Sequence, residues 1–199
     1  MDAAALIKDL GEKGFGVIPS FLTPDEVAKL SDEIDELSPR FIQAGVGSEE
    51  NHSLQPSIRT DKTLWLEPEN LTAQQTLLWD RLSQVKNEIN HTLFIGLWEL
   101  GGFYAIYEPG GFYKRHLDTF KDDDARILSV IIYLNENWKT GDGGELLIYP
   151  DKNSNASVKI EPRGGTLVCF LSKDIPHQVS QCNITRKSFT GWFKARVSV

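Results

Sequence analysis

Short apolar runs separated by turn residues fill the chain from Leu100 onward. The runs are rich in β-branched and aromatic residues, with Gly, Pro, Asn or Asp clusters between them. Such runs are typical of β-strands, and about eight of them at this spacing indicate a β-sandwich or a barrel such as a jelly roll. They do not alternate with helical patterns, which disfavours a parallel Rossmann-type sheet. The predicted strands are 102–108, 112–116, 127–134, 145–149, 156–161, 166–171, 177–181 and 188–197.

The first third of the chain has a different pattern, because its apolar residues recur at helical spacing. Thr23 is suited to begin a helix, since it precedes a proline and lies three residues before a glutamate, as in a capping box. We therefore expect helices packed on one face of the β core, together with one short strand and a mobile loop. The predicted helices are 3–13, 24–37 and 72–94, the strand is 14–19, and the loop is 40–58.

The charge balance is acidic, with 21 Lys and Arg residues against 28 Asp and Glu residues and a net charge of −7 over 199 residues. A net-negative surface opposes binding to phosphate backbones, so a nucleic acid is not the expected partner. The longest apolar run, 127–134, is interrupted by a serine and is too short for a membrane helix, which needs about 20 residues. The start of the chain lacks a basic segment followed by a long apolar one, and Cys169 and Cys182 are too few for a disulfide framework. We therefore expect a cytoplasmic protein with no membrane partner.

Two histidines and one aspartate in the β-rich half form a candidate metal site. His116 and Asp118 are two residues apart at the end of a predicted strand, so their side chains point to the same side. His177 begins a later predicted strand, and enough strands lie between for the chain to bring it back beside His116 and Asp118. Two histidines and one carboxylate with open positions form the facial triad of non-haem Fe(II) oxygenases. The alternative is a surface aspartate beside a half-buried histidine. We expect His52 and His91 to be ordinary surface or half-buried residues.

Arg186 follows His177 near the entry to the last predicted strand. A guanidinium inside a barrel requires an anion, and it matches a carboxylate with two parallel hydrogen bonds. A dicarboxylate bound to the metal at one end could reach it with the other, whereas the alternative is a surface arginine in a polar turn. Tyr107, Tyr113 and Tyr133 lie in the same strands, where each either binds this carboxylate or simply packs.

These motifs resemble the Fe(II)- and 2-oxoglutarate-dependent dioxygenases, and among them the prolyl hydroxylases. The resemblance covers residues 100–197. The similar segments are 107–118 (Y-x-P-G-x…Y-x-R-H-x-D), 129–135 (Y-L-N), 143–146 (G-G-x-L), 176–179 (P-H-x-V) and Arg186 with Thr190 and Trp192 (R-x-x-x-T-x-W).

A further segment, residues 58–65, is similar to the I-R-x-D-x-x-x-W segment of the hypoxia-inducible-factor type of prolyl hydroxylase. In that group the segment forms a mobile loop that covers the protein substrate. The alternative for Arg59 and Trp65 is a strand with one core aromatic residue. A shorter turn after Pro109 and the lack of a zinc-finger region differ from the animal enzymes and suggest a bacterial relative.

The resemblance implies a mainly β fold with packed helices (α+β), built on a double-stranded β-helix (jelly-roll) core with N-terminal helices on one face. It implies one dioxygenase domain over 1–199, in which 1–99 provide helical support and a substrate-covering loop and 100–197 form the catalytic core. The implied cofactors are Fe(II), the cosubstrate 2-oxoglutarate and O₂, with ascorbate as an optional addition. It assigns His116, Asp118 and His177 to the metal and to catalysis, Arg186, Tyr107, Tyr133 and Thr190 to 2-oxoglutarate, and Arg59, Asp61, Trp65, Arg126 and Trp192 to the substrate.

The implied reaction is hydroxylation of a prolyl residue in a cytoplasmic protein, with release of succinate and CO₂. Elongation factor Tu is the substrate that the bacterial branch suggests. Two alternatives stay open, namely an oxygenase acting on a small molecule and a non-catalytic sensor that binds metal and 2-oxoglutarate. A peptide substrate predicts a broad open groove beside the metal, whereas a metabolite predicts a closed pocket. Nucleic-acid demethylation uses the same metal chemistry but fits poorly with the net charge of −7.

Overall fold

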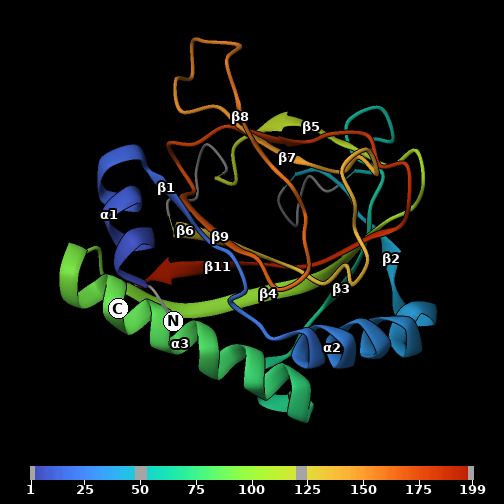
Figure 1. The fold of residues 1–199 in the computed structure, drawn as a ribbon, viewed down its shortest axis with the longest axis horizontal. Helices are drawn as coiled ribbons and strands as arrows, with labels where there is room; N and C mark the ends of the chain where they lie inside the picture. The colour runs from blue at the N-terminus through green and yellow to red at the C-terminus, as the bar shows by residue number, and fades with distance from the viewer. Residues whose placement is uncertain (1–2, 48–52, 120–124, 197–199) are drawn as a thin grey trace.

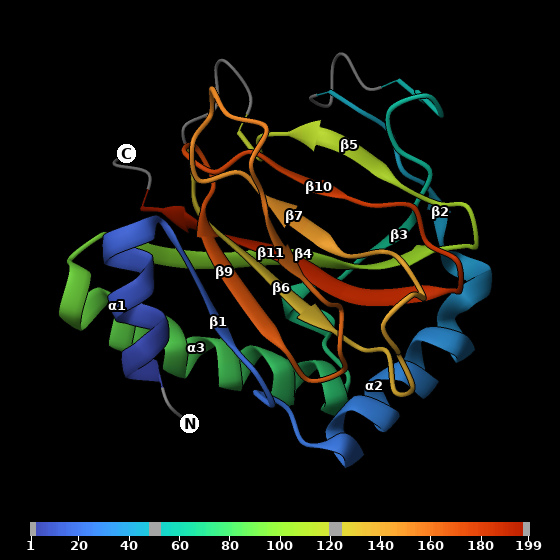
Figure 2. The same ribbon diagram turned by 45° about the horizontal axis from the view of Figure 1, so that its top comes forward.

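The computed structural model describes residues 3–47, 53–119 and 125–196, which form two antiparallel sheets with helices along one of them (Figure 1). The strands are β1 (Phe15–Ile18), β2 (Ile42–Gln43), β3 (Lys62–Trp65), β4 (Leu97–Tyr107), β5 (Tyr113–His116), β6 (Arg126–Tyr133), β7 (Leu146–Ile148), β8 (Val158–Ile160), β9 (Leu167–Leu171), β10 (His177–Val179) and β11 (Arg186–Ala195). The larger sheet has the order β1-β9-β6-β11-β4-β3-β2, and the smaller sheet has the order β5-β10-β7-β8. Figure 2 shows the smaller sheet lying over the larger one.

Three α-helices cover the outer face of the larger sheet (Figure 1). They are α1 (Ala3–Lys13), α2 (Pro24–Leu37) and α3 (Ala73–Leu93). The described residues also contain the short 3₁₀-helices η1 (Ser38–Arg40) and η3 (Pro68–Asn70). Thr23 forms the expected capping box with Glu26, and Thr72 forms the same motif with Gln75. Each cap satisfies a backbone N–H that the first turn of the helix leaves without a partner. No helix among the described residues is long and apolar enough to cross a membrane.

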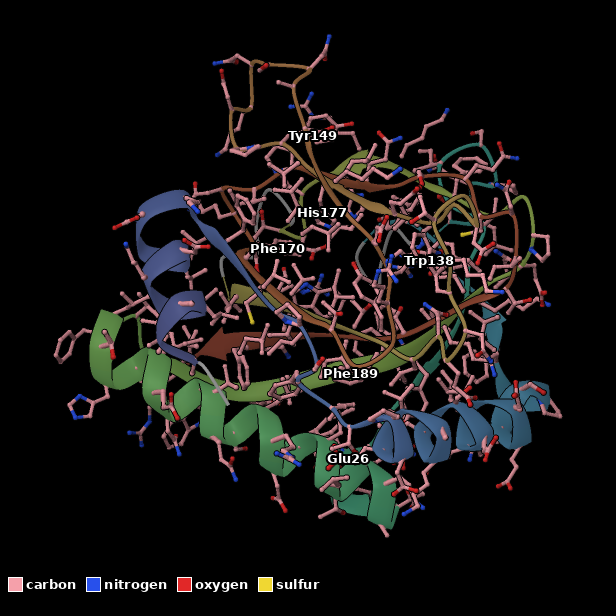
Figure 3. All side chains as sticks on the ribbon, viewed as in Figure 1. Glu26, Trp138, Tyr149, Phe170, His177 and Phe189 are labelled. Carbon is pink, nitrogen blue, oxygen red and sulfur yellow. The ribbon has the colours of Figure 1, made fainter. Side chains whose placement is uncertain are left out.

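Strand β6 shows why the chain makes two apolar layers. Its residues alternate between the two faces of the sheet, because side chains on a strand have a period of two. Val130 and Ile132 pack in the cluster that includes the helices, whereas Ile131 and Tyr133 pack in the cluster between the sheets. Burial of each such side chain contributes about 1.5–3 kcal/mol to folding. Figure 3 shows the interior that these two layers fill.

The eight strands predicted from Leu100 onward are all present, and the mainly β fold class with helices on one face is confirmed. The prediction of a mobile loop over 40–58 was wrong in part, because Ile42–Gln43 forms a strand that pairs with β3. Residues 48–52 of that loop lie outside the described residues. Two residues are too few to show a period of two, so the sequence carries no signal for this strand. His52 lies outside the described residues, and His91 is exposed as expected.

The second half of segment 58–65 also forms a strand, because β3 runs from Lys62 to Trp65. Strand β3 pairs with β2 on one side and with β4 on the other. Trp65, at its end, is 53% exposed, so it is not the core aromatic residue that a plain strand interpretation required. Strands β3 and β2 are therefore the last strands at one edge of the larger sheet, beside the space between the two sheets.

Candidate functional site

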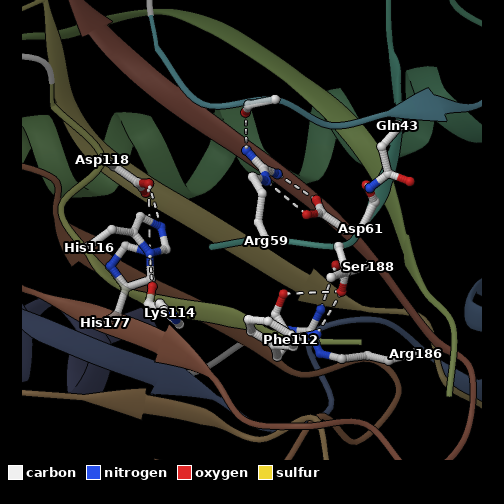
Figure 4. A network of polar contacts seen from close by, with 12 residues as sticks. Gln43, Arg59, Asp61, Phe112, Lys114, His116, Asp118, His177, Arg186 and Ser188 are labelled. Carbon is white, nitrogen blue, oxygen red and sulfur yellow. Dashed lines mark hydrogen bonds and ion pairs between the residues drawn. The ribbon is translucent and has the colours of Figure 1, made fainter. Parts of the chain in front are cut away.

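Strand pairing brings His116, Asp118 and His177 together between the sheets. His177 on β10 is the direct register partner of His116 on β5, although 60 positions of chain lie between them. The Nε2 atoms of His116 and His177 lie 3.5 Å and 3.6 Å from the same oxygen of Asp118, Oδ1. One nitrogen or oxygen from each residue lies within 4.8 Å of the others. Figure 4 shows the three side chains converging on one point.

Backbone carbonyls fix the orientation of both imidazole rings. Nδ1 of His116 lies 2.7 Å from the carbonyl oxygen of Lys114, and Nδ1 of His177 lies 3.2 Å from that of Ile175. A carbonyl only accepts hydrogen bonds, so these partners assign the proton to Nδ1 and leave the Nε2 lone pair directed at the shared point. The neutral imidazole with a free Nε2 is the form that binds metal ions.

The electrostatics of the three groups also suit a cation. Burial lowers the pKa of His177 to about 4, and repulsion from His116 acts in the same direction. Burial by itself raises the pKa of Asp118, but the nearby histidines and a hydrogen bond from Ser129 outweigh it and hold this pKa well below its ordinary value. Near neutral pH the site therefore presents the neutral imidazole of His177 and the carboxylate anion of Asp118. Two imidazoles and one carboxylate with open positions are a donor set that fits Fe(II).

A buried arginine lies in the same space. Arg186, at the start of β11, is 2% exposed, so the alternative of a surface arginine does not hold. Its Nε donates to the carbonyl oxygen of Gly144 at 2.9 Å, and its Nη1 donates to the hydroxyl of Ser188 at 3.2 Å. A guanidinium has five N–H donors, so these two bonds leave room for an anion.

Tyrosine side chains surround the guanidinium of Arg186. The rings of Tyr107 and Tyr133 each lie 5.0 Å from its central carbon. The hydroxyl of Tyr133 is buried and has no hydrogen-bond partner within the described part of the chain. A buried hydroxyl without a partner is costly, and a carboxylate bound by Arg186 would satisfy it. This end of the site therefore fits one carboxylate of a dicarboxylate ligand.

A cavity of about 370 Å³ joins the triad to Arg186 and opens to the surface. Aromatic residues form one wall, in which Trp192 lies 6.0 Å from Trp65 and 5.6 Å from Phe103 between ring centroids. The guanidinium of Arg126 stacks on Trp192 at 3.8 Å and donates from Nη1 to the backbone carbonyl of Asp118 at 3.0 Å. This wall therefore reaches directly to the triad.

Arg59 and Asp61 form an ion pair beside the cavity (Figure 4). Arg59 lines the cavity and stacks over the ring of Tyr113 at 4.4 Å, and that ring in turn stacks on His116 with centroids 3.6 Å apart. Burial lowers the pKa of Arg59, but the hydrogen bond to Asp61 outweighs it and raises this pKa. The positive charge of Arg59 therefore lies directly over the Tyr113 ring that stacks on His116.

The twelve residues that the resemblance assigned to the metal, to 2-oxoglutarate and to the substrate fall into two groups. Ten of them line the cavity, whereas Tyr133 and Asp61 are not among its lining residues and instead contact two that are, Arg186 and Arg59. The lining residues among them are His116, Asp118, His177, Arg186, Tyr107, Thr190, Arg59, Trp65, Arg126 and Trp192.

Two kinds of contributors were missed. Residues 42–47 line the cavity, although the segment carries no chemical motif. Ser129, a fully buried residue, contacts Asp118. The signal for Ser129 was available in the sequence, because it is a polar residue inside the longest apolar run.

Comparisons with known proteins agree with this geometry. Residues 102–194 match the family described as the 2OG-Fe(II) oxygenase superfamily. The chain is 34% identical to a Pseudomonas putida prolyl-4-hydroxylase. The match covers 99% of this chain and 100% of that one, with a TM-score of 0.86. It is 25% identical, with a TM-score of 0.83, to a prolyl hydroxylase from Trichoplax adhaerens solved in complex with a hypoxia inducible factor peptide fragment, and the match covers 96% of this chain and 88% of that one.

Curated relatives are longer than this chain. It is 30% identical to the hypoxia-inducible factor prolyl hydroxylase of Caenorhabditis elegans, and the match covers 96% of this chain but 28% of that protein. It is 27% identical to Egl nine homolog 1 of Homo sapiens, with 94% of this chain and 45% of that protein covered. The chain therefore spans less than half the length of these two relatives.

Proposed function

We propose that this chain, which belongs to the 2OG-Fe(II) oxygenase superfamily, hydroxylates a prolyl residue of a protein substrate. Members of this superfamily use Fe(II), 2-oxoglutarate and O₂. The observation that carries the proposal is the presence, in one cavity, of the His116, Asp118 and His177 triad and the buried Arg186. In this proposal 2-oxoglutarate and O₂ are consumed, and succinate, CO₂ and a hydroxylated residue are released.

We assign the three triad residues to the metal, through Nε2 of each histidine and Oδ1 of Asp118. When bound, Fe(II) with 2-oxoglutarate and O₂ supplies the oxidising chemistry that hydroxylates a C–H bond. The protein provides a face of three ligands and leaves the remaining positions open. The stacked ring of Tyr113 covers His116 and helps to exclude water from the ligand side.

Arg186 binds the distal carboxylate of 2-oxoglutarate, and the tyrosines orient it. The hydroxyl of Tyr133 supplies a further donor, which agrees with its lack of a partner among the described residues. Tyr107 and Thr190 line the same cavity and complete the polar end. A fixed distal carboxylate holds the oxo acid end at the metal, because the cosubstrate is then bound at both ends.

The aromatic wall receives the substrate. Trp65, Phe103 and Trp192 offer flat apolar surfaces to a pyrrolidine ring. Nε1 of Trp192 is buried and has no acceptor among the described residues, so a carbonyl oxygen of a bound peptide would satisfy it. Arg126 and the pair of Arg59 and Asp61 shape the remainder of this groove.

A protein substrate is supported by the mouth of the cavity. Ile42 is 67% exposed, Trp65 53% and Leu117 38%, and all three line the cavity. Exposed apolar side chains at the rim of a cleft are typical of interaction sites. The Trichoplax adhaerens relative was solved with a peptide fragment, which supports the same mode of binding.

The finer parts of the proposal rest on the resemblance seen in the sequence. We propose that residues 1–199 act as one catalytic domain in the cytoplasm, without nucleic acid or membrane partners. We propose elongation factor Tu as the first substrate to test and ascorbate as an optional reductant in the assay. A small molecule is the second candidate, because a cavity of about 370 Å³ is also the size of many small-ligand pockets.

The test is mass spectrometry of proteins treated with the enzyme, Fe(II), 2-oxoglutarate and air. Purified elongation factor Tu and a cell lysate serve as substrate sources, and the His116→Ala variant serves as the control. We expect one added oxygen on a specific proline, absent with the variant. Succinate is measured in the same samples.

The outcomes separate the candidate functions. Succinate formation without any oxidised protein would favour a small-molecule substrate and overturn the prolyl proposal. No succinate with any source would favour a binding protein that lacks turnover. Near-normal 2-oxoglutarate decarboxylation by His116→Ala would contradict the assignment of His116 to the metal.

A further inference from the structure

Ser129 contacts the aspartate of the triad from inside the apolar layer. It lies in the middle of β6 and is completely buried. Its hydroxyl lies 2.7 Å from Oδ2 of Asp118 and 2.9 Å from the hydroxyl of Ser172, which follows β9 and is also completely buried. Two buried serines therefore form a continuous polar chain that ends on the Asp118 carboxylate.

The direction of the hydrogen bonds in this chain is fixed by chemistry. An ionised carboxylate only accepts hydrogen bonds, so the proton of Ser129 points to Asp118. The Ser129 oxygen is then left to accept from Ser172. Each serine thus donates toward the carboxylate, and no alternative arrangement satisfies both contacts at once.

Rigid backbone supports both serines. The N–H of Ser172 donates to the carbonyl oxygen of Ile127 on β6 at 3.0 Å, and Ser129 is paired with Phe170 across β6 and β9. The serine hydroxyls are therefore held between two strands whose ladder is continuous from Leu128 to Ile132. Side chains on such strands position a site more exactly than side chains on loops.

The two oxygens of Asp118 consequently have different roles. Oδ2 is occupied by Ser129, whereas Oδ1 is the oxygen that lies 3.5 Å and 3.6 Å from the two histidine nitrogens. A carboxylate turned so that both oxygens met the metal would take an additional ligand position. That position is one that the cosubstrate and oxygen need.

We propose that Ser129, supported by Ser172, is a positioning residue that holds Asp118 so that a single oxygen binds the metal. This inference rests on the metal site of the proposed function. The hydroxyl of Ser129 touches neither substrate nor metal and acts only through Asp118. Hydrogen-bond partners of metal ligands typically change metal affinity or activity about 10- to 100-fold when they are removed.

Two variants of equal shape test the hydroxyl alone. Ser129→Thr keeps the hydroxyl and Ser129→Val replaces it with a methyl group, so both add the same bulk to the buried site. Co(II), added alone to the metal-free proteins, is the probe. Its dissociation constant is measured by calorimetry, and its visible absorption bands report the number and arrangement of ligands.

We expect Ser129→Val to bind Co(II) about 10- to 100-fold more weakly than Ser129→Thr, with altered absorption bands, while Ser129→Thr keeps the wild-type bands. Ser172→Ala should fall between them, because Ser129 keeps its bond to Asp118. Ser129→Ala against wild type makes the same comparison without added bulk and decides the question if both larger variants fail to fold. Melting temperatures of the metal-free proteins establish that each variant is folded.

Equal affinities and equal spectra for the hydroxyl-containing and hydroxyl-free variants would overturn this inference while leaving the proposed function intact. Failure of the wild-type protein to bind Co(II) would overturn the metal site and the proposed function with it. Activity toward a protein substrate is needed for neither result.

Discussion

Arg59 and Asp61 bind each other through two parallel contacts, Nε to Oδ1 at 2.8 Å and Nη2 to Oδ2 at 2.5 Å. The Asp61 carboxylate is fully buried, and the Arg59 side chain is 13% exposed. The backbone of Asp61 also ties two segments together, since its carbonyl accepts from the N–H of Ala44 and from the side chain of Gln43. The pair therefore anchors the segment that forms the rim of the cavity.

Replacement of Asp61 with Asn should destabilise the protein by about 3 kcal/mol, because it leaves the buried Arg59 guanidinium without its anion. Urea unfolding of the metal-free protein measures this change. The matched control is Asp9→Asn, which removes an exposed ion pair with Lys13 and should cost less than about 0.5 kcal/mol. A change for Asp61→Asn as small as that of the control would show that Arg59 finds water or another partner.

Replacement of Arg186 with Lys should raise the dissociation constant of 2-oxoglutarate by about tenfold or more. Lysine keeps the charge but loses the planar fork that binds a carboxylate with two bonds, and a charge-assisted hydrogen bond contributes about 1.5–3 kcal/mol. Calorimetry with Mn(II) in place of iron measures the binding without turnover. Arg163→Lys, at an exposed pair with Glu161, is the control, and an unchanged 2-oxoglutarate affinity in Arg186→Lys would remove Arg186 from the cosubstrate site.

Replacement of Gly144 with Ala should weaken 2-oxoglutarate binding by displacing Arg186. Gly144 has a φ of +73°, and a Cβ there would lie 2.9 Å from Cδ of Arg186 and 2.9 Å from Sγ of Cys182. Gly141→Ala separates crowding from backbone strain, since Gly141 has a φ of +104° but, apart from its chain neighbours, no described residue has an atom within 4 Å of its Cβ position. We expect both variants to lose thermal stability and only Gly144→Ala to bind 2-oxoglutarate more weakly. Equal affinities in the two variants would contradict this role of Gly144.

Replacement of Tyr133 with Phe should weaken 2-oxoglutarate binding about 2- to 10-fold, the effect of one hydrogen bond of about 0.5–1.5 kcal/mol. The stability of the metal-free protein should change little, because the hydroxyl has no partner among the described residues. Parallel calorimetry and urea unfolding measure the two quantities. A large loss of stability with unchanged 2-oxoglutarate affinity would show that the hydroxyl has a structural role instead.

The same variant should alter the response of the protein to alkali. Burial raises the pKa of Tyr133 from 10.0 to about 12, so the folded state holds this proton more tightly than the unfolded state does. The stabilisation is therefore complete below pH 10 and is lost as the pH rises toward about 12. Melting temperatures between pH 9 and pH 11.5 should fall less steeply for Tyr133→Phe than for wild type, and parallel curves would contradict the shifted pKa.

Local patterns in the sequence predicted most of the elements from which the site is made. The turn residues after Leu100 marked eight strands, and Thr23 marked a helix start, because strand alternation and helix capping depend on residues a few positions apart. The same local rule placed His116 and Asp118 on one side of a strand. The resemblance then assigned Arg186, Tyr107 and Tyr133 to 2-oxoglutarate. Spacing alone left open whether these side chains bind a carboxylate.

The tertiary structure decided what depends on pairing between distant segments. It set His177 opposite His116, and it buried Arg186 beside Tyr107, where the local sequence allowed a surface turn equally well. It also joined Ser129 to Asp118. Residue types and local spacing therefore determined the strands and the chemistry that they carry. Strand register decided which groups meet, because it depends on the packing of the whole sheet, which no short window of sequence contains.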